Sequence, residues 1–278
     1  MIRSMSWRNR KAAQAFLEEH SDMTSPMLGN LISSSWNRDP FSKRKGYCFL
    51  NIREGELVGF LGCFMDGNAM LYALDEEAIL DFLDILDRQS FHTLWVFDGE
   101  ERSVKLLMAQ LEDRFRLVRY HMMIQEETQE VFCVDLSVED VRTQSKDPSL
   151  VSFVRRILKE CFGYDAYMPA VMARMQDRSE EEPYLVGSLA DGTRVAQTHV
   201  QAICSDYGYI GGVATLPEYQ GRGYAKQMVL TICRMLHRSG RKVSLTVDPE
   251  NESAYHLYRK LGFEKRGLVC VLQRKSAY

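Results

Sequence analysis

Short stretches in which apolar and polar residues alternate are separated along this chain by stretches in which apolar residues return every three or four positions. The first pattern is typical of half-buried β-strands and the second of amphipathic helices. Over residues 75–87, for example, Ala78, Ile79, Phe82 and Leu86 fall on one helical face. The predicted strands are 47–53, 57–65, 68–74, 93–97, 115–125, 130–136, 184–188, 194–203, 209–216, 243–247 and 267–273. The predicted helices are 7–19, 27–36, 75–87, 100–114, 150–162, 164–178, 224–238 and 252–261, with a break at 21–26.

The predicted elements follow the same order twice. Helices, a meander of strands, and then helix, strand, helix and strand fill the first half, and the second half repeats them. Residues 140–147 are polar and end at Pro148, which indicates a boundary. We therefore predict two α/β domains, residues 1–140 and 148–278, that arose by duplication. Two unrelated α/β domains with similar apolar patterns are the alternative.

The composition is that of a globular protein. Of the 278 residues, 45% are hydrophobic and 26% are charged, and the formal net charge is −3. This balance argues against nucleic acid or a membrane as a partner, and no run of about 18 apolar residues is present to span a bilayer. The seven cysteines are dispersed, without a C-x-x-C pair or a nearby His cluster. We therefore expect no metal site, reduced thiols and a cytoplasmic location.

A glycine-rich loop, Gln220-Gly221-Arg222-Gly223, joins a predicted strand to a predicted helix. Glycines at such a junction let the backbone approach a ligand closely. The first helical turn adds unpaired N–H groups and partial positive charge, so a phosphate or diphosphate is the expected ligand. The loop lacks the Gly-Lys-Ser/Thr ending of a P-loop and the G-x-G-x-x-G spacing of dinucleotide-binding folds. An ordinary glycine-rich connection is the alternative.

The spacing Gln220-x-x-Gly223-x-Ala225 resembles the Gln/Arg-x-x-Gly-x-Gly/Ala signature of the GNAT acetyltransferase superfamily. Residues 245–263 resemble a second signature, a strand followed by Asn-x-x-Ala-x-x-Leu-Tyr-x-Lys-Leu-Gly-Phe. The resemblance is specific across residues 184–263 and loose elsewhere. It implies an α/β (α+β mixed) protein with two GNAT-like domains, each a mixed, mostly antiparallel central sheet flanked by helices.

The first of these two domains is expected to be a degenerate copy. Its strand-to-helix junction reads Leu71-Tyr-Ala-Leu-Asp-Glu-Glu-Ala78 and has no glycine loop. Acidic side chains at this place can cap the helix but repel a phosphate. We therefore expect one working site, in the second half.

The resemblance also assigns roles to residues. Gly211 and Gly212 correspond to the bulge at which two central strands separate to admit the pantetheine arm of coenzyme A. The cofactor-binding residues that it implies are Val213, Ala214, Thr215, Gln220, Gly221, Arg222, Gly223, Tyr224, Ala225 and Asn251. For Asn251, capping of the following helix is the alternative role. Tyr258 matches the family tyrosine that protonates the departing thiolate.

The function implied is the transfer of an acetyl group from acetyl-CoA to a primary amine, by direct attack through a tetrahedral intermediate. The general base stays open between His199, Asp206, Glu160 and a chain of waters, and His199 is our candidate because it titrates near neutrality. No cysteine nucleophile is required.

The acceptor and the oligomeric state are not fixed by the sequence. A small molecule or a peptide can carry the amine, and a homodimer is compatible with everything above. Tyr164, Asp165 and Tyr167 fall in the region that shapes the acceptor pocket in similar proteins, with packing and capping as their alternative role. Two alternatives to the function remain: a non-catalytic CoA-binding or scaffold protein, and an enzyme that uses a longer acyl donor.

Overall fold

A computed structural model of the chain describes residues 1–33, 46–64, 67–88, 91–97, 101–111, 114–127, 132–144, 146–164, 175 and 181–275. The chain forms two compact units. The first unit consists of Met1–Ile124, Thr246–His256 and Glu264–Tyr278, and the second consists of Gln125–Leu245 and Leu257–Phe263.

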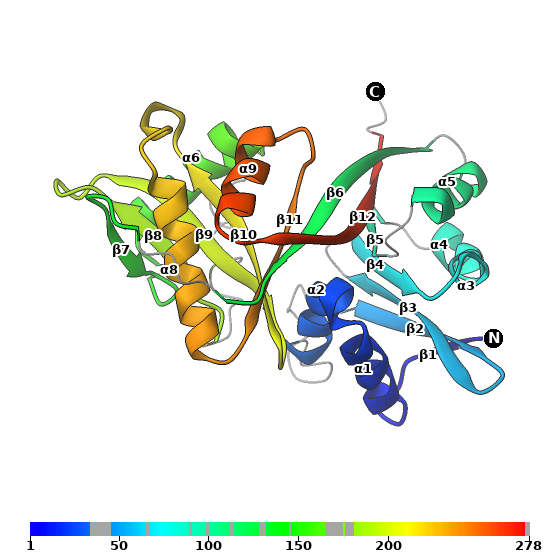
Figure 1. Ribbon diagram of the computed structural model, residues 1–278. Helices are drawn as coiled ribbons and strands as arrows, with labels where there is room; N and C mark the ends of the chain where they lie inside the picture. Colours follow the sequence, from blue (N-terminus) through cyan, green and yellow to red (C-terminus); the bar gives the residue numbers. More distant parts are fainter. Residues whose placement is uncertain are drawn as a thin grey trace. The chain divides into compact units, whose positions relative to one another are not determined.

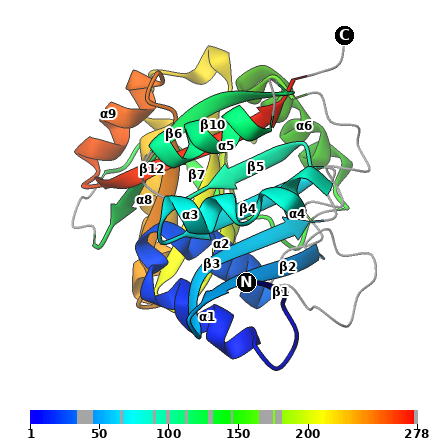
Figure 2. The same cartoon turned by 90° about the vertical axis from the view of Figure 1, so that its right-hand side faces the viewer.

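The first unit is built on a sheet with the strand order β1-β2-β3-β4-β5-β12-β6 (Figures 1 and 2). Its strands are β1 (Ile2–Ser4), β2 (Gly46–Arg53), β3 (Glu56–Phe64), β4 (Asn68–Ala73), β5 (Thr93–Val96), β12 (Glu264–Arg274) and β6 (Phe115–Gln125). Neighbouring strands are antiparallel except β4 and β5, which run parallel. A parallel pair needs a crossover connection, and two short helices between β4 and β5 supply it.

Helices cover both faces of this sheet. One face carries α3 (Glu76–Leu80), α4 (Leu83–Arg88) and α5 (Glu101–Gln110), which lie together in front of the strands in Figure 2. Their buried side chains, among them Ile79, Phe82 and Leu107, share a core with alternate residues of β3, β4 and β5. The other face carries α1 (Arg10–Glu19) and α2 (Ser21–Ser33), and here the rings of Phe16 and Tyr72 lie 5.7 Å apart.

The second unit has the strand order β11-β10-β9-β8-β7. The strands are β7 (Ser137–Asp140), β8 (Tyr184–Ser188), β9 (Arg194–Ile203), β10 (Tyr207–Thr215) and β11 (Lys242–Val247). Neighbouring strands are antiparallel except β10 and β11, which run parallel and are connected through a helix.

Two long amphipathic helices cover opposite faces of the second sheet. The first is α6 (Pro148–Phe162), which begins at the capping carboxylate of Asp147 and ends at Gly163 in the left-handed conformation. Its apolar side packs on Tyr184, Val186 and Ala214. The second is α8 (Tyr224–Arg238), whose Met228 lies on the other side of β8, because a Cβ built on Gly187 would come within 3.0 Å of its sulfur. The last helix is α9 (Glu252–Lys260), and its residues from Leu257 onward belong to this unit.

The predicted fold class is confirmed, because both units are mixed, mostly antiparallel sheets flanked by helices. The compact units do not follow the predicted division into residues 1–140 and 148–278. The last strand, β12, is inserted between β5 and β6, where Cys270 is opposite Val96 on one side and Arg119 on the other. Its fully buried run from Val269 to Leu272 needs a covered neighbour on both edges, and the first unit provides both.

Local differences from the predicted elements are small. The expected break at residues 21–26 is wrong, because α2 begins at Ser21 and contains Pro26. The helix predicted at 75–87 is divided into α3 and α4. Of the strand predicted at 130–136, residues 132–136 are irregular rather than a strand, and residues 130–131 lie outside the described residues. Most of the helix predicted at 164–178 lies outside the described residues.

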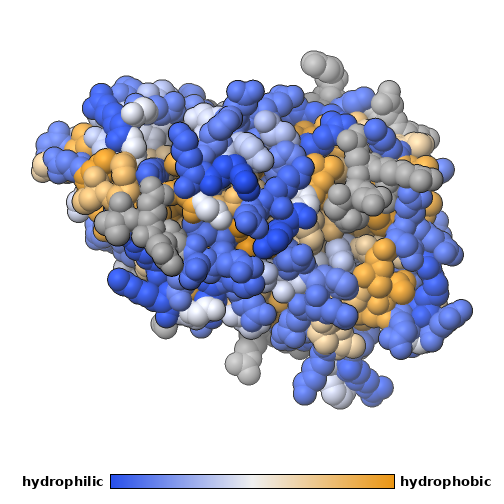
Figure 3. Space-filling view, in the orientation of Figure 1, coloured by the Kyte–Doolittle hydropathy of each residue, from blue (hydrophilic) through white to orange (hydrophobic). Residues whose placement is uncertain are grey.

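The visible face in Figure 3 is mostly hydrophilic, with hydrophobic groups in small separate areas. Among the residues that the structure describes, no helix combines the length and the apolar character needed to cross a bilayer.

Candidate functional site

The pairing between β10 and β11 stops early. Register partners run only from Tyr207 and Lys242 to Tyr209 and Ser244, although β10 continues through Thr215. Six residues of β10 therefore extend beyond the last position at which β11 pairs with it. A sheet that opens in this way leaves one edge of a central strand available to another extended group.

A β-bulge lies at the start of this opening. Gly211 pairs with His199, and the next register pair is Ala214 with Gln197. Between these pairs β10 has two residues and β9 has one, so β10 carries one extra residue. Gly212 takes φ +60°, which is the left-handed region, and a Cβ on it would lie 2.3 Å from His199 Cε1. Only glycine satisfies both conditions. The bulge therefore depends on the Gly211-Gly212 pair identified in the sequence.

The loop after β10 leads directly into an uncapped helix. A short 3₁₀ turn, Pro217–Tyr219, is followed by Gly221 and Gly223, both at positive φ, and α8 starts at Tyr224. Gly223 is the N-cap residue, no side chain caps the N-terminus, and the first turn contains no acidic residue. The backbone N–H groups and the positive end of this 15-residue helix are thus arranged as at an anion site.

The side chains of the loop point back to its own backbone. Gln220 Nε2 donates to the Thr215 carbonyl at 3.0 Å, and the same oxygen accepts from Cys161 Sγ at 3.5 Å. Arg222 donates to the Glu218 carbonyl at 3.3 Å and stacks over Tyr219. These contacts fix the loop, and they also occupy the carbonyl oxygen of Thr215, one of the predicted cofactor-binding residues.

Two polar atoms beside the loop fit a further ligand. Thr215 Oγ1, in a residue only 7% exposed, and Gln227 Oε1 are buried, and neither has a hydrogen-bond partner in the described part of the chain. Buried polar groups nearly always have partners, so two orphaned atoms at the ends of the same loop are unusual. A diphosphate with its attached polar chain offers both donors and acceptors at this place.

The irregular segment 132–136 lies against the start of α8. A Cβ on Gly223 would come within 2.8 Å of Phe132 Cζ, and Lys226 Nζ lies 4.3 Å from the centre of the Phe132 ring. The N-cap position therefore needs glycine for two reasons, its φ of +81° and this close approach. Sequence reasoning found the glycine but not the segment that covers it.

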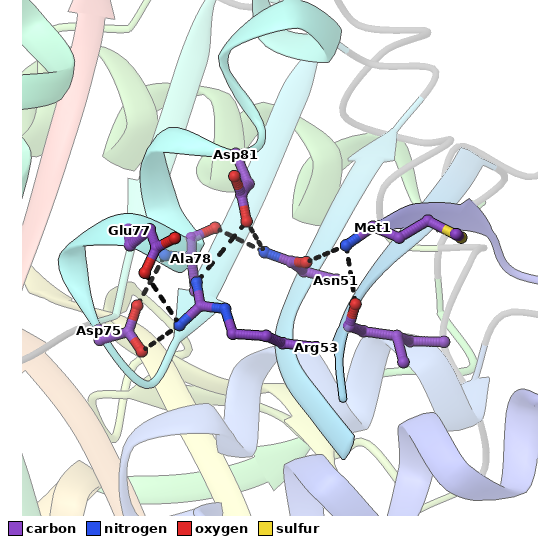
Figure 4. Close-up of polar contacts among 8 residues, drawn as sticks. Met1, Asn51, Arg53, Asp75, Glu77, Ala78 and Asp81 are labelled. Carbon is purple, nitrogen blue, oxygen red and sulfur yellow. Dashed lines mark hydrogen bonds and ion pairs between the residues drawn. The ribbon is translucent and has the colours of Figure 1, made fainter. Parts of the chain in front are cut away.

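The matching junction of the first unit is closed by carboxylates (Figure 4). Asp75 caps α3 by accepting from Ala78 N at 2.7 Å. Arg53 Nη1 lies 3.0 Å from Asp75 and 3.3 Å from Glu77. The buried amide of Asn51 donates to Asp81 at 2.8 Å. The helix start that would face a phosphate here is already occupied by acidic groups, as the sequence predicts for a degenerate copy.

Tyr258, the predicted proton donor, is buried in the second unit. It is 7% exposed, and its ring meets Phe263 edge to face at 5.6 Å. Burial raises the pKa of its phenol, with smaller contributions from Cys233 and Tyr209, so the hydroxyl carries its proton at neutral pH. That is the state in which a phenol can donate a proton to a leaving group.

The remaining predicted residues are placed as follows. Asn251 caps α9, because its Oδ1 accepts from Ala254 N at 3.1 Å, which is the alternative role foreseen for it. Its contact with pantetheine stays a prediction. Glu160 forms an ion pair with Arg156 at 2.8 Å, Asp206 is exposed at the β9–β10 turn, and His199 lies at the bulge. The structure therefore brings only His199, of the three candidate bases, to the backbone of the opened strand.

The region expected to shape the acceptor pocket is described only in part. Tyr164 follows α6 and is 52% exposed, whereas Asp165 and Tyr167 lie outside the described residues. Two further residues, Tyr184 and Gln197, were not singled out from the sequence. Gln197 Nε2 donates to the Gly212 carbonyl in the bulge, and the Tyr184 hydroxyl donates to Gln197. In the sequence, the one sign of them is Gln197, a polar residue at a strand position where the alternating pattern predicts an apolar side chain.

Comparisons with known proteins agree with this geometry. Residues 189–272 match the family model described as FR47-like protein. A prophage-derived uncharacterised N-acetyltransferase of Bacillus subtilis, YokL, is 37% identical over 75 residues, which is 26% of this chain and 41% of that relative. The match thus spans about two fifths of the relative's length.

Solved structures match the whole chain. An X-ray structure of a Drosophila protein has a TM-score of 0.72 at 10% identity and covers 99% of this chain and 98% of its own. A tandem GNAT protein from the clavulanic acid biosynthesis pathway has a TM-score of 0.59 at 12% identity and covers 100% of both chains. At such low identities these structures show the fold. The whole chain therefore has the fold of a tandem GNAT protein, and residues 189–272 are similar to the FR47-like family.

Proposed function

We propose that the second unit transfers an acetyl group from acetyl-CoA to a primary amine. The observation that carries this proposal is the continuous course of β10: six residues of it lie beyond its pairing with β11, and the loop that follows leads into the uncapped start of α8. An extended amide chain can pair with the open strand while its diphosphate meets the helix N-terminus. Coenzyme A has this combination of groups.

The residues that hold the coenzyme follow from this alignment. Backbone groups of Val213, which point away from β9, pair with the pantetheine amides, and the N–H groups from Gly221 to Ala225 bind the diphosphate. Thr215 contributes its orphaned hydroxyl rather than its carbonyl, since Gln220 and Cys161 already donate to that oxygen.

The transfer is direct from thioester to amine. The amine nitrogen forms a bond to the acetyl carbon, the carbon–sulfur bond breaks, and the Tyr258 hydroxyl gives its proton to the departing thiolate. His199 accepts the proton that the amine releases. Cys161, the thiol that contacts Thr215, is unsuited to an acyl-cysteine route, because burial and the nearby Glu160 and Glu218 raise its pKa and keep it protonated.

Turnover with a panel of amines tests the proposal. The protein is mixed with acetyl-CoA and each amine, and free coenzyme A is separated and quantified, with Tyr258→Phe as the variant. We expect the variant to bind acetyl-CoA normally and to turn over about 10²- to 10⁴-fold more slowly, which is the usual contribution of one general acid. Wild-type protein that binds acetyl-CoA but releases no coenzyme A with any amine would support the non-catalytic alternative.

A further inference from the structure

Tyr184 and His199 form one stacked pair on the α6 face of the second sheet. They are register partners on β8 and β9, and their ring centroids lie 4.9 Å apart with an interplanar angle of 14°. Tyr184 is only 4% exposed and belongs to the core beneath α6. Because the tyrosine ring is fixed by this core, it restricts the plane in which the imidazole can lie.

The hydroxyl of Tyr184 reaches the bulge through a second residue. It donates to Gln197 Oε1 at 2.7 Å, and Gln197 Nε2 donates to the Gly212 carbonyl at 3.3 Å. Gln197 is 1% exposed, so its amide cannot exchange these partners for water. The orientation of the amide is therefore fixed by Tyr184, and it fixes the direction of the Gly212 carbonyl.

Tyr184 therefore has two branches of contacts, one through its ring to His199 and one through its hydroxyl to Gln197, and both lead to Gly212. The imidazole of His199 occupies the space that a Cβ of Gly212 would fill, while the carbonyl of the same residue is held by Gln197. The side chain of Tyr184 thus controls both the backbone of the bulge and the ring of His199, the candidate base. Neither contact requires Tyr184 to touch a substrate.

We propose that Tyr184 is a positioning residue for the acetyl transfer, acting through Gln197 on the cofactor strand and through its ring on His199. This inference rests on the proposed function of the second unit. The hydroxyl sets the Gly212 peptide and hence the fit of the pantetheine arm, and the ring sets the angle at which His199 meets the amine.

Two variants separate the two branches. Tyr184→Phe keeps the ring and removes the hydroxyl, which leaves the buried Gln197 oxygen without its donor. We expect the KM for acetyl-CoA to rise about tenfold, within the range for one unsatisfied buried group, with kcat changed less than about threefold. Tyr184→Leu removes the ring as well, and we expect kcat to fall by at least about tenfold in addition, because orientation of the base is lost.

A matched control is Val186→Ala on the same strand. Val186 is 2% exposed, packs in the same core and is the register partner of Gln197, but it belongs to neither contact chain. It should lower the thermal midpoint while leaving KM and kcat near the wild-type values. In a Gln197→Leu background, Tyr184→Phe should produce no further rise in KM, because the hydroxyl acts through that amide.

The His199 ring also gives a spectroscopic readout that is independent of turnover. Its Hε1 resonance should carry the ring-current shift of the stacked tyrosine in wild type and in Tyr184→Phe, and lose it in Tyr184→Leu. Tyr184 variants that fold, lose the stack and still match Val186→Ala in KM and kcat would overturn the inference. Absence of turnover in the wild-type protein would instead contradict the proposed function, so the two failures are distinguishable.

Discussion

An acidic residue in the first turn of α8 should weaken the binding of acetyl-CoA without weakening the fold. The first turn of α8 has none, whereas α3 in the first unit begins with a capping aspartate and two glutamates. Ala225→Glu would give α8 a similar charge. Since a carboxylate near a helix N-terminus stabilises the helix by about 0.3 to 1 kcal/mol, the variant should fold at least as well as the wild type.

The size of the effect can be worked from the charges. A carboxylate about 6 Å from a phosphate charge, at an effective dielectric constant of about 40, is repelled by about 1.4 kcal/mol. Two such charges, reduced by salt, give about 2 kcal/mol, or about a 30-fold weaker Kd. At a concentration of 100 times the wild-type Kd, the added stability then falls from about 2.7 to about 0.9 kcal/mol.

Thermal unfolding with and without acetyl-CoA measures this difference. For a cooperative unit of 150 to 250 residues, the wild-type midpoint should rise by about 5 to 11 °C and that of Ala225→Glu by about 2 to 4 °C. Ala225→Gln is the matched control, because it adds a side chain of the same size without charge, and it should keep the wild-type shift.

Either of two results would refute this reasoning. Equal shifts in wild type and Ala225→Glu would place the diphosphate away from α8. Equal losses in Ala225→Glu and Ala225→Gln would show that volume at this position matters, not charge, and would leave the helix N-terminus without its assigned role.

Three further predictions concern the bulge, the pH range and the stoichiometry. Gly212→Ala should abolish acetyl-CoA binding in calorimetry, because the methyl group meets His199. The control is Gly192→Ala, which lies at φ +85° with no atom within 4 Å of the new methyl group and should lower stability without affecting binding. Binding of acetyl-CoA by Gly212→Ala would contradict the role of the bulge. Burial lowers the pKa of His237 below its ordinary value of 6.5, so the unfolded chain takes up the proton first as pH falls. The contribution of His237 to the free energy of unfolding should be complete above about pH 6.5 and decline below it. In urea titrations, His237→Gln should reduce the slope of the free energy of unfolding against pH. An unchanged slope would contradict this prediction. Acetyl-CoA should saturate at one molecule per chain, and a stoichiometry of two would contradict the closed junction of the first unit.

The parts of the site that the sequence predicts are those that depend on backbone conformation. Gly212, Gly221 and Gly223 all take positive φ, and few other residues do so at low cost, so their letters already carry the geometry. The apolar spacing of residues 224–238 similarly gives α8, because a helix with one buried face has little alternative. Fold class and loop therefore followed from local rules.

The parts that the sequence does not predict depend on contacts between distant residues. Nothing in the sequence of β12 shows that it enters the first sheet between β5 and β6, since any strand buried on both faces has the same apolar run. Tyr184 and Gln197 meet the bulge only after three strands align in register. Asn251 satisfied a family motif and a capping rule equally well, and the structure shows the cap.

The two units reuse one order of elements but satisfy the start of the crossover helix in opposite ways. In the first unit the first-turn donors of α3 are met from within the chain, and Asp75, Glu77 and Asp81 surround a single guanidinium, Arg53. In the second, α8 starts at a glycine and its first turn contains no acidic residue. A helix of 5 residues with its own carboxylates has neither the dipole nor the free donors to hold a diphosphate, whereas a helix of 15 residues without them has both. If the second unit binds acetyl-CoA as proposed, the two copies differ in which group supplies the negative charge at one helix end.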